Sequence, residues 1–76
     1  MNKSINELDF DIIERCNKML KNSSYLSSYN IKNLMNIGEY NPNKISTLLY
    51  IYHNNKISES GKEYFLLNIY SLIPNN

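Results

Sequence analysis

The sequence predicts an all-α protein, folded as a compact bundle of about four helices. Apolar residues recur at spacings of three and four, and helix start and stop signals divide the chain into short segments. No stretch of any length shows the alternation typical of a strand. With 76 residues, 42% of them hydrophobic, the chain is expected to form a single small helical domain.

The first helix is expected to begin at about residue 5 or 9 and to end near residue 21, after a polar lead-in over residues 1–7. Two start signals compete: a capping-box pattern from Ser4 to Glu7, and an N-cap at Asp9. Acidic residues precede basic ones along this segment, an order that the helix dipole favours. The expected apolar side consists of Leu8, Ile12, Ile13, Cys16, Met19 and Leu20.

A shorter second helix is expected after Tyr25 and Leu26, an apolar pair between serines that suggests a short extended segment. Ser27 or Ser28 supplies its N-cap. Gly38 suits the left-handed conformation that closes a helix. The residues expected to point inward are Ile31, Leu34 and Met35.

The third helix has the clearest start signal, with Asn41 as N-cap and Pro42 at the first helical position. It is expected to run to about residue 52 or 53. The expected inward residues are Ile45, Leu48, Leu49 and Tyr52. The expected outward face is uncharged and polar, formed by Asn43, Thr47, Tyr50 and Asn54 with Lys44 at its edge. Such a face is suited to reading base edges in a DNA groove and is equally typical of an amphipathic surface helix.

The last helix is expected over about residues 61–73, with a stop at Pro74. Ser58 and Ser60 both precede a Glu-containing turn, and Ser60 to Glu63 forms a capping box. One face is formed by Phe65, Ile69, Leu72 and Ile73, and the remaining circumference is largely apolar as well. Two interpretations stay open: tyrosines that are half exposed in a monomer, or a helix shared between two subunits. In a homodimer, the expected interface residues are Tyr64, Leu67 and Tyr70.

Composition argues against several classes of function. A net charge of +1 is small for a nucleic-acid-binding protein and argues against binding of a membrane surface through a basic face. No apolar run approaches the roughly 18 residues of a membrane span. The single cysteine, Cys16, excludes an internal disulfide and indicates a cytoplasmic location. The absence of Ala, Val, Gln and Trp, with abundant Asn, Ile, Lys and Tyr, indicates an AT-rich genome such as that of a low-GC bacterium, a phage or a virus.

The sequence predicts no enzyme, no cofactor and no metal site. A glycine-rich phosphate loop is missing, and one His with one Cys does not make a four-ligand metal site. Cys16 lies in the apolar stripe of the first helix, where a thiol more often acts as a small hydrophobic group than as a nucleophile. His53 is expected at the end of the third helix, near the free carbonyls or the solvent.

The segments 31–38 and 41–49 resemble the second and recognition helices of winged-helix regulators, a family of helix-turn-helix DNA-binding proteins. Residues 52–57 are similar to the segment that leads into the wing, and residues 58–65 to the start of the following helix, but a full wing is missing. The resemblance implies a helix-turn-helix-like core over residues 8–57 and a C-terminal helix over 58–73. It also implies base contacts from Asn43, Lys44, Thr47 and Tyr50, and phosphate contacts from Lys32 and Lys56.

Three functions follow as hypotheses. The first is a dimeric transcriptional regulator that binds double-stranded DNA through its third helix. The second is a non-enzymatic inhibitor or adaptor, encoded by a phage or other mobile element, that binds a host protein. The third is a self-assembling helical protein that uses its last helix.

Overall fold

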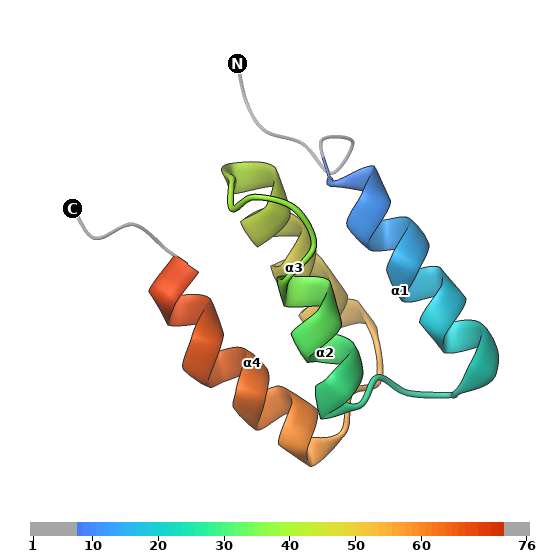
Figure 1. Cartoon of the computed structure of the whole chain (residues 1–76). Helices are drawn as coiled ribbons and strands as arrows, with labels where there is room; N and C mark the ends of the chain where they lie inside the picture. Colours follow the sequence, from blue (N-terminus) through green and yellow to red (C-terminus); the bar gives the residue numbers. More distant parts are fainter. Residues whose placement is uncertain (1–7, 73–76) are drawn as a thin grey trace.

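The computed structural model describes residues 8–72 and confirms the all-α class (Figure 1). The start signal at Ser4 to Glu7, the apolar Ile73 and the stop at Pro74 lie outside these described residues. The helices are α1 (Phe10–Asn22), α2 (Ser28–Met35), α3 (Pro42–Asn54) and α4 (Glu59–Leu72).

Three of the predicted start signals are confirmed by hydrogen bonds. The Asp9 carboxylate accepts from the backbone N–H groups of Asp11 and Ile12, so α1 begins at the second of its two candidate starts. Ser27 caps α2 by accepting from the Asn30 N–H at 3.1 Å. The Asn41 side chain caps α3 by accepting from the Lys44 N–H at 2.9 Å.

Two predicted helix boundaries are wrong. The last helix begins at Glu59, because the Ser58 hydroxyl, and not that of Ser60, accepts from the Gly61 N–H at 3.0 Å. The second helix ends at Met35, before Gly38. Gly38 has the expected positive φ of 67°, but it bends the α2–α3 connection instead of closing α2 directly.

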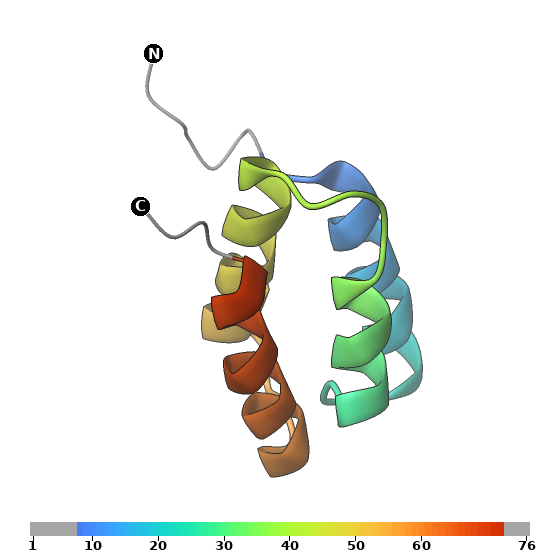
Figure 2. The same cartoon turned by 60° about the vertical axis from the view of Figure 1, so that its left-hand side comes forward.

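The helices form two stacked hairpins, α1–α2 and α3–α4, which are the two layers seen in Figure 2. Helices α1 and α3 pack together and run in the same direction, and so do α2 and α4 (Figure 1). The diagonal pairs, α1 with α4 and α2 with α3, make the fewest contacts. The sequence shows no internal repeat, yet α1 and α3 both have 13 residues and occupy equivalent places in their hairpins.

This arrangement does not confirm a helix-turn-helix core. Residues 36–41 connect α2 to α3, which is longer than the usual turn of about three or four residues in that motif. Because α2 and α3 also lie on a diagonal, each packs mainly on α1 or α4 and not on the other.

The linkers of the two hairpins are joined by a parallel β-bridge between Leu26 and Ile57. The Leu26 N–H donates to the Lys56 carbonyl, and the Ser58 N–H donates to the Leu26 carbonyl, both at 2.8 Å. Both bridge residues are buried, so the pairing satisfies backbone groups that water cannot reach.

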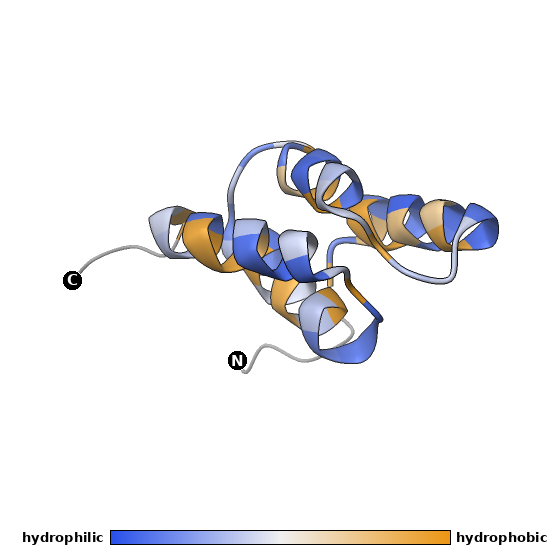
Figure 3. Ribbon diagram, turned by 90° about the horizontal axis from the view of Figure 1, so that it is seen from below, coloured by the Kyte–Doolittle hydropathy of each residue, from blue (hydrophilic) through white to orange (hydrophobic). Residues whose placement is uncertain are grey.

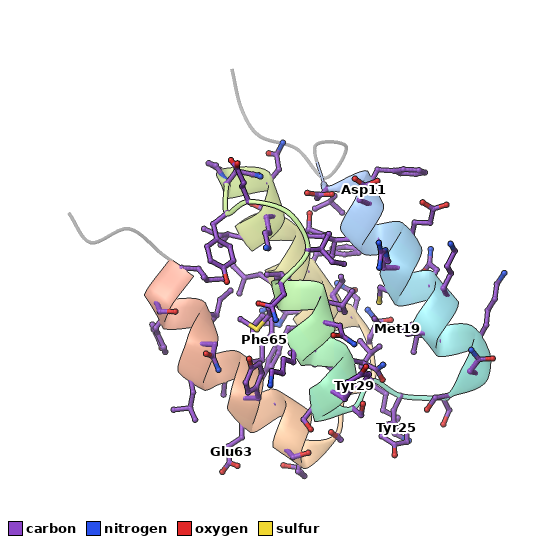
Figure 4. The ribbon with its side chains drawn as sticks, in the orientation of Figure 1. Asp11, Met19, Tyr25, Tyr29, Glu63 and Phe65 are labelled. Atoms are coloured by element: carbon purple, nitrogen blue, oxygen red, sulfur yellow. The ribbon has the colours of Figure 1, made fainter. Side chains whose placement is uncertain are left out.

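The core lies between the two hairpins, where the apolar sides of the helices meet (Figure 3). Phe65 points from α4 into this interior, whereas Glu63 points away from it (Figure 4). No helix within residues 8–72 has both the length and the hydropathy needed to cross a membrane. The buried apolar residues are Ile12, Cys16, Leu26, Ile31, Leu34, Met35, Leu48, Ile51, Ile57, Phe65 and Ile69.

Candidate interaction surfaces

Thr47, expected on the outward face of the third helix, is completely buried. Its hydroxyl donates to the Asn43 carbonyl at 2.6 Å and accepts from the Asp9 N–H at 2.6 Å. It therefore ties the start of α1 to α3. The expectation that Thr47 faces the solvent is wrong. A buried hydroxyl needs hydrogen-bond partners, and the Asp9 N–H at the start of α1 and the Asn43 carbonyl supply them.

Lys44, expected at the edge of the same face, is also completely buried. Its ammonium donates to the Gly38 carbonyl at 3.2 Å and lies 4.1 Å from the centre of the Tyr40 ring. These contacts hold the 36–41 connection against the start of α3. Burial lowers the pKa of Lys44, because desolvation disfavours the charged form, and the charge of Asp9 opposes this effect.

The buried face of α3 is thus displaced by one residue from the prediction. It consists of Lys44, Thr47, Leu48 and Ile51, while Ile45, Leu49 and Tyr52 are half-buried. The sequence contained a signal for this displacement, because Ile51 is apolar but was not among the residues expected to point inward. Leu48 is common to the predicted and observed faces.

The other four residues expected at a DNA interface are at least partly accessible. Tyr50 is exposed on α3, Asn43 is half-buried, and Lys32 and Lys56 are exposed on α2 and in the α3–α4 linker. With Lys44 and Thr47 inside, the six residues do not form the single face that the resemblance implies.

The outer face of α4 is apolar at its centre. Leu67 is 76% exposed, Tyr70 is 75% exposed and Leu66 is 46% exposed, and Glu63 lies on the same side towards the helix start. Of the three residues expected at a homodimer interface, Leu67 and Tyr70 are exposed on this face. Tyr64 turns partly into the protein and is half-buried.

A shallow groove of 380 Å³ runs beside this face, between the end of α3 and the start of α4. Its wall on the α3 side is Tyr52, whose ring lies 4.6 Å from that of Phe65, centre to centre. Lys62 and Glu59 form an exposed pair at 3.9 Å on the other side. The lining residues are Tyr52, Glu59, Ser60, Lys62, Glu63 and Leu66.

The structure also places the single cysteine and the single histidine of the chain. Cys16 is buried in the core, and burial raises the pKa of its thiol, which disfavours the nucleophilic thiolate. His53 is exposed at the end of α3 with its ring edge-on to Tyr52. Within residues 8–72, no group of His, Cys, Asp and Glu side chains is placed to hold a metal ion.

Two exposed tyrosines were not predicted as site residues: Tyr29, which is 70% exposed on α2, and Tyr25 in the α1–α2 linker. A signal for this region was present: no acidic residue occurs between Glu14 and Glu39.

Comparison of the chain with protein-family models, with curated proteins and with solved structures finds no match.

Proposed function

We propose that this protein is a non-enzymatic interaction module that pairs with a second copy of itself through the outer face of α4. The observation that carries the proposal is the exposure of Leu66, Leu67 and Tyr70 side by side on one helix. Exposed apolar patches on small proteins commonly mark interaction sites, and Tyr contributes contact area together with a hydroxyl.

The order of residues along α4 favours a second copy as the occupant. A two-fold interface must be self-complementary, because the same surface is present on both sides. In an antiparallel pairing centred between Leu66 and Leu67, the leucines of the two copies meet in the middle. Each Glu63 then lies near Tyr70 of the second copy, where the phenol is able to donate to the carboxylate.

Sedimentation equilibrium over a range of protein concentrations tests this pairing. A stable interface usually buries about 800 Å² per partner. Three side chains supply only part of that area, so we expect weak, concentration-dependent dimers. Leu67→Glu should abolish dimerisation, while Phe10→Ser, which removes an equally exposed ring from α1, should leave it unchanged. A strict monomer at all concentrations would contradict self-pairing.

Reading of double-stranded DNA by α3 is the second candidate, favoured by the exposure of Tyr50, Lys32 and Lys56. It receives less support, since neither Lys44 nor Thr47 is able to reach a base edge from the core. A titration with duplex DNA at two salt concentrations tests it, with Lys32→Gln as the variant that removes an expected phosphate contact. Equal affinity for all sequences would exclude sequence reading.

A further inference from the structure

The region around the α1–α2 linker combines positive charge with exposed aromatic rings. Between Glu14 and Glu39 the chain has no acidic residue, whereas it has Arg15, Lys18, Lys21 and Lys32, all of them exposed. These residues occupy the second half of α1 and the outside of α2. Residues 15–38 therefore carry four positive charges and no negative one, although the net charge of the whole chain is only +1.

The β-bridge brings a further lysine to the same place. Leu26 and Ile57 are paired in parallel register and both are buried. Because side chains alternate along an extended segment, the preceding residues on each side, Tyr25 and Lys56, point outward. Paired segments lie about 4.8 Å apart, so these two side chains leave the surface next to each other.

A second ring and a second lysine follow at the start of α2. Tyr29 and Lys32 are three residues apart on the helix, a spacing that places them on one face. Both are exposed. Tyr25 and Tyr29 lie at the end of the molecule where α1 passes into α2 (Figure 4). We call the group Tyr25, Tyr29, Lys32 and Lys56 the linker surface.

The acidic residues nearest to this end belong to α4. Glu59 is paired with Lys62 at 3.9 Å, and Glu63 points away from the protein (Figure 4). The remaining described acids, Asp9, Asp11, Glu14 and Glu39, belong to the start of α1 and to the α2–α3 connection.

We propose that the linker surface binds single-stranded nucleic acid. Its two lysines suit the phosphates of a short stretch of backbone, and its two exposed rings offer faces on which unpaired bases stack. Paired bases in a duplex do not present their faces, so rings in this position favour single strands. This site is separate from the α4 face and does not depend on the proposed self-pairing.

Fluorescence anisotropy with labelled oligothymidylate and oligouridylate, at low salt and with the full chain, tests the proposal. Tyr29→Leu should weaken binding by roughly five-fold to 150-fold, because a stacked base contributes about 1–3 kcal/mol. Tyr29→Phe should retain binding, since the ring and not the hydroxyl stacks. Tyr70→Leu, an equally exposed tyrosine on α4, is the matched control and should have no effect.

The salt dependence gives an independent readout. Lys32→Gln should reduce the slope of log K against log salt by about 0.7, the value for one phosphate contact on a single strand. Lys62→Gln, on α4, should leave the slope unchanged. Three results would each overturn the proposal: no binding of either oligonucleotide, equal affinity for duplex DNA or anionic phospholipid vesicles, or an unaltered affinity of Tyr29→Leu. Circular dichroism establishes that each variant is folded.

Discussion

Lys44 and Thr47 show how two polar residues come to lie inside a small core. Each buried side-chain nitrogen and oxygen atom among the described residues has a hydrogen-bond partner. Thr47 finds its partners at the start of α1 and in its own helix, and Lys44 finds its partners in the α2–α3 connection. A buried ammonium is nevertheless costly, because one hydrogen bond and one ring replace its hydration only in part.

This cost makes the effect of Lys44 on stability depend on pH. Below its lowered folded-state pKa, Lys44 is charged in both states and the full cost of burial is present. As pH rises towards the unfolded-state value of 10.5, the folded state releases its proton first, so the wild type should gain stability.

Urea unfolding at pH 7 and pH 10 measures this effect against Lys44→Met, which keeps the length of the side chain without the charge. The free energy of unfolding of the wild type, minus that of the variant, should increase with pH. The same subtraction with Lys18→Met, a substitution of an exposed lysine, should give no such increase. A difference for Lys44→Met that stays constant with pH would contradict the interpretation.

At the scale of the elements, the first turn of α4 is positioned by close contact with both linkers. Gly61 is buried, and a Cβ at this position would lie 2.8 Å from Ile57 Cγ2 and 3.3 Å from the Ser27 carbonyl carbon. The glycine is thus needed for space and not for a positive φ. Its absent side chain lets α4 pack against the cap of α2.

Gly61→Ala should therefore destabilise the protein even though alanine favours helices by about 1 kcal/mol over glycine. Overpacking in a tight site typically costs about 1–3 kcal/mol, so we expect a net loss. Ser60→Ala, one residue earlier and exposed, makes the same first turn more helix-prone without a clash and should be neutral or stabilising. Thermal unfolding compares the stabilities of the two variants with that of the wild type. A Gly61→Ala variant more stable than the wild type would contradict the prediction, because it would mean that Ile57 shifts to make room.

At the scale of the whole molecule, two hairpins share one core and neither has a separate one. Residues of all four helices and of both linkers contribute to the buried cluster, and α1–α3 and α2–α4 contacts cross between the hairpins. Such a small domain buries only about 60% of its unfolded surface, so neither half is expected to be stable alone.

Leu26→Ala should consequently destabilise the entire protein and not the first hairpin alone. Leu26 is completely buried at the bridge, and truncation of a buried leucine costs about 2–5 kcal/mol. Circular dichroism and tyrosine fluorescence should report a single shared unfolding transition, shifted to lower urea. Leu67→Ala removes the same atoms from a side chain that is 76% exposed, so it should shift the unfolding transition little. Two separate transitions in Leu26→Ala would contradict a shared core.

Much of the secondary structure could be predicted because its signals are local. The Asp9, Ser27 and Asn41 caps act within a few residues of their own position, and the apolar spacing of α1 and α2 gives their buried sides. The orientation of α3 could not be predicted in this way. Thr47 is inside because the Asp9 N–H at the start of α1 is available as a donor. Lys44 is inside because the Gly38 carbonyl in the α2–α3 connection is available as an acceptor.

The sequence by itself determined the number of helices and their approximate limits, since periodicity and capping are properties of short segments. Only the tertiary structure decided which face of α3 is buried and that α2 and α3 lie on a diagonal. It also placed Lys56 beside Tyr25, through a hydrogen-bonded contact between residues far apart in the chain. The physical reason is that buried hydrogen bonds and helix packing depend on partners brought together by the complete fold.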